Sequence, residues 1–137
     1  MSMIKKISHV AVVVSDIDAA LEFWRDALGL KLSYAEDLPE QDAEVAFLQL
    51  GDSEIELFRP TVDDNGAARF LAENKSGMHH IALEVDDLDA MIERLQSEGV
   101  HLINHESVAA ARGRRAVFVH PSSASSVLVE LYEAAGK

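Results

Sequence analysis

Two stretches of the chain repeat one another and determine the fold: His9-Val-Ala-Val-Val-Val-Ser-Asp16-Ile-Asp-Ala19 and His80-Ile-Ala-Leu-Glu-Val-Asp-Asp87-Leu-Asp-Ala90. The two histidines lie 71 residues apart in the chain, and so do Asp16 and Asp87. In each stretch an apolar run leads into acidic residues. Apolar residues spaced i, i+3, i+4 and i+7 begin there and continue beyond it: Ile17, Ala20, Leu21 and Trp24 in the first copy, and Leu88, Met91, Ile92 and Leu95 in the second. This pattern is typical of a strand followed by an amphipathic helix. The chain is therefore built from two copies of one module.

The residues after each helix predict three further strands per module. In the first module we expect strands at 31–36, 45–50 and 54–58, with a Gly51-Asp52 turn between the last two. In the second we expect a short strand near 101–104 and longer ones at 116–120 and 127–131. Ser15, three residues before Asp18, resembles a capping box at the start of the first helix. The segment 105–114 is expected to be a mobile loop.

These elements predict an α+β fold in which two tandem βαβββ modules form a curved mixed sheet. We expect a single domain over residues 1–137, with module 1 at about 6–59 and module 2 at about 78–133. The linker at 60–77 contains a possible short helix around 67–74.

Composition excludes several classes of function. The chain has no cysteine, which excludes disulfides, zinc ribbons and thiol nucleophiles and is compatible with the cytoplasm. Its 12 basic and 24 acidic residues give a net charge of −12, which disfavours nucleic acid and anionic membranes as partners. No apolar run approaches the roughly 18–20 residues of a membrane span. An anionic substrate would need local positive charge, which a divalent cation can supply.

The repeat also brings four potential metal ligands into equivalent positions. His9 and His80 lie on the first strand of each module, and Glu56 and Glu130 lie in apolar surroundings on the last. A pseudo-twofold relation between the modules would bring all four together, and two imidazoles with two carboxylates suit a first-row divalent ion. His79 should point away from this site, because neighbouring side chains on a strand alternate between its faces.

The chain resembles the vicinal oxygen chelate (glyoxalase/bleomycin resistance/dioxygenase) superfamily from about residue 6 to residue 132, and within it is most similar to the methylmalonyl-CoA epimerase family. The matching segments are Ile7-Ser-His9-Val-Ala-Val, Phe23-Trp24, Leu28-Gly29-Leu30, Leu38-Pro39-Glu40-Gln41, Glu54-Ile-Glu56-Leu, Phe70-Leu-Ala-Glu-Asn74, Gly77-Met-His79-His80, Phe118-Val-His120-Pro121 and Val127-Leu-Val-Glu130-Leu.

The resemblance implies a metal-dependent epimerase. His9, Glu56, His80 and Glu130 would bind one divalent ion (Co, Mn, Ni, Zn or Mg). The substrate would be a methylmalonyl-type acyl-CoA thioester whose α-proton one carboxylate removes and another acid returns. Some members carry a glutamate proposed as the base at the position that Val45 occupies here. The remaining candidates are Glu40, Glu44 and a ligand carboxylate such as Glu130 or Glu56.

A second departure from the family is Ser122–Ser126, which stands where members commonly have a lysine and glycines. In this superfamily the two modules complete a site within one chain or swap halves between two chains. We expect a homodimer with each site built within one chain, because the 18-residue linker can span the turn between the modules.

Three alternatives remain open at this stage. A glyoxalase I-type lactoylglutathione lyase uses the same ligand types, but its typical motif after the first glutamate is replaced by Leu57–Thr61. A ring-cleaving dioxygenase is usually longer and binds iron through three ligands. A small-molecule-sequestering resistance protein has this fold but needs no metal ligands, so four ligands in register argue against it.

Overall fold

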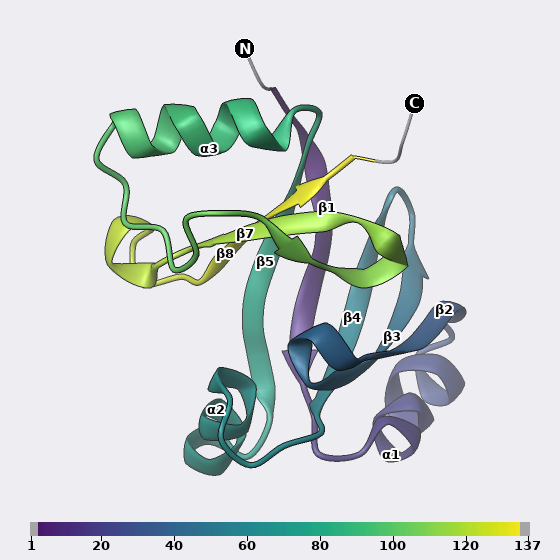
Figure 1. Ribbon diagram of the computed structural model, residues 1–137. Helices are drawn as coiled ribbons and strands as arrows, with labels where there is room; N and C mark the ends of the chain where they lie inside the picture. The colour runs from purple at the N-terminus through teal and green to yellow at the C-terminus, as the bar shows by residue number, and fades with distance from the viewer. Residues whose placement is uncertain (1–2, 135–137) are drawn as a thin grey trace. The chain divides into compact units, whose positions relative to one another are not determined.

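The predicted α+β architecture of two βαβββ modules is confirmed by the computed structural model, which describes residues 3–134 (Figure 1). The strands and α-helices are, in chain order, β1 (Ile4–Val13), α1 (Ile17–Leu21), β2 (Lys31–Leu38), β3 (Ala43–Leu50), β4 (Ser53–Pro60), α2 (Gly66–Asn74), β5 (Gly77–Val85), α3 (Leu88–Ser97), β6 (Val108–Ala109), β7 (Arg115–Val119) and β8 (Val129–Glu133). Shorter helical segments are a π-helical turn at Glu22–Ala27 and 3-10 turns at Pro39–Gln41, Ala111–Gly113 and Pro121–Ser123.

The chain divides into two compact units with the same strand topology. The first unit, His9–His79, has the strand order β2-β3-β4-β1, with β1 parallel to β4 and β3 antiparallel to both of its neighbours. Of the described residues, the second unit contains 3–8 and 80–134. Its order is β5-β8-β7-β6, with β5 parallel to β8 and β7 antiparallel to both of its neighbours. Each unit therefore contains mixed pairing, as the repeat predicted.

One face of the strands in each unit packs against that module's helix. In the first unit Leu21 of α1 packs with Ala46, Leu48 and Leu57. In the second unit Leu88, Met91 and Ile92 of α3 pack with residues of β5, β7 and β8. In Figure 1 α3 lies beside β7 and β8. Burial of these apolar side chains is the main source of stability in each unit. Because strand side chains alternate, the other face of each module carries a different set of residues.

Both module helices begin at an aspartate that caps the first turn. The Oδ1 of Asp16 accepts a hydrogen bond from the backbone N–H of Ala19 at 3.1 Å, and Asp87 accepts one from Ala90 at the same distance. The predicted capping role of Ser15 was therefore wrong. Asp16 is the better cap because its side chain reaches the third residue after it.

The first helix also differs from the prediction in its second half. After Leu21 it continues as the π-helical turn Glu22–Ala27 rather than as regular α-helix. The N–H of Leu28 donates to the carbonyl of Phe23 at 2.8 Å, which is an i to i+5 bond.

The second module contains the largest departure from the predicted strands. Residues 101–104 form no strand, and only Leu102 makes an isolated antiparallel bridge to Val119. The short strand β6 lies instead at Val108–Ala109, inside the segment expected to be a loop, and pairs with β7. Hairpin pairing with Ala116 and Arg115 of the next strand decides this, since the local sequence has no strand pattern there.

The helices of the described residues are short, and α3, the longest α-helix, has 10 residues. None of the described helices is long and apolar enough to cross a membrane.

Candidate metal centre

The first unit holds a buried histidine–glutamate pair. His9 on β1 and Glu56 on β4 are 2% and 4% exposed, and Nε2 of His9 lies 3.3 Å from Oε1 of Glu56. Parallel pairing of β1 with β4 places Ala11 beside Glu56, so His9, two residues earlier, leaves its strand on the same face as Glu56. We call His9 and Glu56 the His9 pair.

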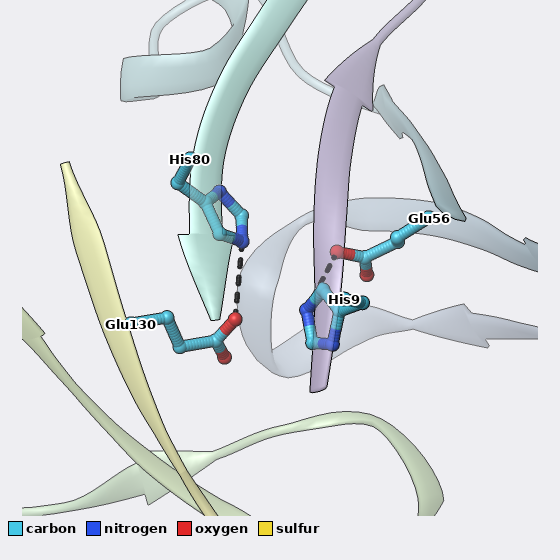
Figure 2. A group of neighbouring side chains, drawn as sticks. All are labelled: His9, Glu56, His80 and Glu130. Atoms are coloured by element: carbon cyan, nitrogen blue, oxygen red, sulfur yellow. Dashed lines mark hydrogen bonds and ion pairs between the residues drawn. The ribbon is translucent and has the colours of Figure 1, made fainter. Parts of the chain in front are cut away.

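The second unit holds an equivalent pair. His80 on β5 and Glu130 on β8 are each 4% exposed, and Nε2 of His80 lies 3.0 Å from Oε1 of Glu130. Here Ala82 lies beside Glu130 in the parallel pairing, just as Ala11 lies beside Glu56 in the first unit. We call His80 and Glu130 the His80 pair. Figure 2 shows each carboxylate turned toward the imidazole of its own pair.

A phenylalanine fixes the ring of each histidine, and sequence reasoning missed both phenylalanines. The ring of Phe47 on β3 meets that of His9 edge-on, with 5.3 Å between centroids and 84° between planes. The ring of Phe118 on β7 meets that of His80 at 5.6 Å and 88°. Each phenylalanine is the cross-strand neighbour of its pair's glutamate. The signal was present in the sequence, because Phe47 and Phe118 are also 71 residues apart.

The arrangement explains how two carboxylates tolerate burial. A buried carboxylate is expensive unless it is paired or binds a cation. In both pairs an imidazole nitrogen and a carboxylate oxygen face each other, and both atom types are ligands for first-row divalent ions. The described part of the chain thus offers four buried candidate ligands, His9, Glu56, His80 and Glu130, and this donor set fits such an ion.

His79 lies in a different environment from His80. Its ring is stacked on Phe58, with centroids 6.4 Å apart, and meets Phe70 of α2 edge-on at 5.2 Å. His79 is therefore part of an aromatic cluster of the first unit.

The structure places Glu44 on the helix-covered face of the first unit. Its Oε1 accepts a hydrogen bond from Nε of Arg59, its cross-strand partner, at 3.1 Å. Glu44 shares its face of β3 with Ala46, which packs with α1, whereas Phe47 is on the face of His9. Glu44 lines a groove on that side together with Leu21 of α1 and Arg25 of the π-helical turn.

Glu40 is exposed in the 3-10 turn between β2 and β3. The turn ends at Asp42, which has a left-handed backbone conformation with φ of 50°. The carbonyl of Asp42 accepts hydrogen bonds from the N–H of Thr61 at 2.8 Å and from Nδ2 of Asn65 at 3.3 Å. The segment after β4 therefore anchors the turn that carries Glu40.

Two further half-buried carboxylates share a face with a ligand pair, and the sequence did not single them out. Glu36 on β2 is the cross-strand neighbour of Val45, which lies on the Phe47 face of β3. Glu84 on β5 follows His80 by four residues and pairs with Tyr132, two residues after Glu130. Strand alternation predicts such positions only once the register is known.

Similarity to known proteins shows which family this chain belongs to. Residues 8–118 match the model of the Glyoxalase/Bleomycin resistance protein/Dioxygenase superfamily. The chain belongs to this superfamily. Within the superfamily, the chain is 38% identical over 130 residues to the mitochondrial methylmalonyl-CoA epimerase of Mus musculus, covering 94% of this chain and 73% of that protein.

Solved structures of methylmalonyl-CoA epimerases are also similar to this chain in sequence and fold. The methylmalonyl-CoA epimerase from Mycobacterium tuberculosis is 34% identical with a TM-score of 0.93, over 99% of this chain and 92% of that one. A methylmalonyl-CoA epimerase in complex with methylmalonyl-CoA and NH4+ is 31% identical with a TM-score of 0.93, over 98% and 97% of the two chains.

Proposed function

We propose that this superfamily member is a metal-dependent methylmalonyl-CoA epimerase in which His9, Glu56, His80 and Glu130 hold one divalent metal ion. The observation that carries the proposal is the buried histidine–glutamate pair with its edge-on phenylalanine, built once in each module. Relatives that share 31–38% of their residues with this chain are named methylmalonyl-CoA epimerases, and one is solved with methylmalonyl-CoA bound.

The donor set supports Co, Mn, Ni, Zn or Mg as the ion without choosing among them. When bound, a divalent ion supplies a fixed positive charge beside the thioester and carboxylate oxygens of the substrate. The protein's part is to orient the ligands. The edge-on contacts of Phe47 and Phe118 restrict how the two imidazole rings can turn, which preorganises the donor atoms.

Epimerisation requires one group to remove the α-proton and a second to return a proton on the opposite face. We propose Glu130 as one of these groups, because its carboxylate lies on the face that carries the His80 pair and a carboxylate can take up a proton. Glu40 and Glu44 are the candidates for the other. The anchored turn beneath Glu40 favours it, because Glu44 is bound to Arg59 on the helix-covered face.

We further propose that the protein is a cytoplasmic homodimer whose sites are each completed within one chain, as a single domain. The 18 residues of the 60–77 connection give each chain enough length to link its own two modules. The absence of cysteine fits a reducing compartment. A structure that places His9 and His80 of one chain on different metal ions would contradict the assignment of the site to one chain.

The test of the activity is proton exchange in heavy water. The protein is purified, its metal content is measured, and it is loaded in turn with each of the five ions. Deuterium should then enter the α-carbon of methylmalonyl-CoA with at least one of them. Failure to exchange with every ion would overturn the epimerase proposal.

Two alternatives are outcomes of the same experiment. Conversion of the glutathione–methylglyoxal hemithioacetal without exchange on methylmalonyl-CoA would assign the chain to the glyoxalase I class. Protein that purifies without metal and remains inactive after loading would favour a sequestering role.

A further inference from the structure

We propose that Arg114 binds an anionic oxygen group of the substrate on the face of the second unit that carries the His80 pair; this rests on the proposed function. The group is a carboxylate of the acyl part or a phosphate of the CoA part, which share the same recognition chemistry. Guanidinium groups bind both through charge-assisted hydrogen bonds.

Adjacent arginines point to opposite faces of this unit. Arg115 lies on the α3 side, where it binds Oε1 and Oε2 of Glu133 at 2.9 and 3.2 Å and Oδ1 of Asp89 at 3.1 Å. These hydrogen bonds, to Glu133 first and then to Asp89, raise the pKa of Arg115. Arg115 therefore serves to fasten β7 to β8 and to the first turn of α3.

Arg114 lies instead over Tyr132. Its guanidinium carbon is 5.3 Å from the centroid of the Tyr132 ring, which is a cation–π distance. Tyr132 follows Glu130 by two residues, so the two side chains leave β8 on the same face, about 7 Å apart along the strand. The guanidinium of Arg114 thus lies over the residue that follows Glu130, a proposed metal ligand, on the same face of β8.

The backbone and side-chain contacts hold Arg114 in place. The N–H of Arg114 donates to the carbonyl of Ala111 at 3.3 Å, and its own carbonyl accepts from Ala110 at 2.8 Å. The hydroxyl of Tyr132 donates to the carbonyl of Ala111 at 2.9 Å, which ties the same turn to the ring beneath the guanidinium. A cation held in this way loses little conformational entropy when it binds a ligand.

The Tyr132 ring over which Arg114 lies packs with small side chains. Ala82, Ala110 and Ala116 are buried around Tyr132 on this face. Among the described residues Glu84 is the carboxylate that contacts Arg114, at 3.9 Å from Nη1, and the Arg114 side chain is still 24% exposed. A guanidinium has five N–H donors, and one long contact to Glu84 does not use them all.

Charge explains why such a cation is needed. The chain carries a net charge of −12, so an acyl-CoA that bears a carboxylate and phosphates meets a repulsive protein. A fixed cation beside the ligand-bearing face would offset that repulsion where the substrate binds. Arg114 supplies positive charge on this face, where its one carboxylate contact within residues 3–134 is the 3.9 Å approach to Glu84, so its role is to favour anionic ligands.

The experiment compares binding of malonyl-CoA, propionyl-CoA and free CoA to the metal-loaded protein by calorimetry. Malonyl-CoA carries the acyl carboxylate, propionyl-CoA lacks it, and free CoA presents only the phosphates. For Arg114→Gln we expect malonyl-CoA to bind about 10- to 100-fold more weakly, as for loss of a charged hydrogen bond. Loss confined to malonyl-CoA identifies the carboxylate, and equal loss for all three identifies a phosphate.

Two control variants separate recognition from folding. Arg115→Gln should lower the melting temperature and leave the affinity for malonyl-CoA unchanged. Glu84→Gln keeps the cation but removes its ion-pair partner, so it should bind malonyl-CoA at least as tightly as the wild type. Arg114→Lys keeps the positive charge but lacks the planar guanidinium with its five N–H donors, so it should bind malonyl-CoA with intermediate affinity. This variant replaces Arg114→Gln as the test if Arg114→Gln does not fold.

If folded Arg114→Gln binds malonyl-CoA as tightly as the wild type, the inference is overturned. It is also overturned if Glu84→Gln loses as much affinity for malonyl-CoA as Arg114→Gln, because Arg114 and Glu84 would then form a structural ion pair. The epimerase proposal is judged separately, by deuterium exchange in the wild type. If the wild type exchanges the α-proton but Arg114→Gln binds normally, only the role of Arg114 fails. If the wild type binds none of the three CoA compounds, both proposals fail.

Discussion

Replacing His80 and His79 in turn by alanine separates a metal ligand from a structural residue next to it in the chain. Both substitutions should destabilise the metal-free protein. His79→Ala removes ring contacts with Phe58 and Phe70, and aromatic pairs are worth about 0.5–1.5 kcal/mol each, so the loss is about 1–3 kcal/mol. His80→Ala removes the 3.0 Å contact with buried Glu130 and leaves a desolvated carboxylate, for a similar loss of about 1–3 kcal/mol.

Metal addition should distinguish the two variants. An ion at one hundred times its dissociation constant stabilises the folded state by about 2.7 kcal/mol, which for a chain of this size raises the melting temperature by about 10 °C. We expect this rise in the wild type and in His79→Ala but not in His80→Ala. The measurement is thermal unfolding followed by circular dichroism, with and without excess divalent ion.

The design guards against a trivial result, because each variant has its own metal-free reference. A variant that is merely less stable still shows the metal-dependent rise. If His79→Ala lost the rise and His80→Ala kept it, the assignment of His80 as the ligand on β5 would be wrong. If the wild type showed no rise with any of the five ions, the four residues would not form a metal centre under these conditions.

Three further outcomes are expected. Glu40→Gln should lower kcat by at least about a hundredfold with its metal retained, as for loss of a general base, whereas Glu44→Gln should stay near the wild type. The reverse order would assign the base to Glu44. If kcat stayed near normal in both variants, Glu130 would be left as the base. Asn65→Ala removes the cap of α2, in which Asn65 accepts from the N–H of Ala68 at 2.8 Å, and should lower the free energy of unfolding by about 1 kcal/mol in urea titration. Light scattering should give the mass of a dimer, and a monomer mass at micromolar protein would contradict the proposed assembly.

The repeat made most of the fold and the candidate ligand set predictable from sequence. Strand alternation and helical periodicity depend on residues two to four positions apart, so each βαβ pattern could be recognised locally. The 71-residue offset then matched His9 with His80 without any structure. The same offset relates Phe47 to Phe118 in the third strand of each module, so the sequence also carries a signal for the two ring contacts.

Features that depend on which strands pair, and in which register, were decided by the tertiary structure. Strand β6 forms at Val108–Ala109 because β7 is there to pair with it, although the local sequence favoured 101–104. Glu44 and Val45 are neighbours in sequence, and only the pairing of β3 with β4 and the packing of α1 show that Glu44 lies on the helix-covered face. A shift of register by one residue exchanges the two faces of a strand, so a local pattern cannot fix which carboxylate faces the substrate. The sequence alone therefore determined the module and its four candidate ligands. The tertiary structure decided which other charged residues share a face with these ligands: Glu36 rather than Glu44, and Arg114 rather than Arg115.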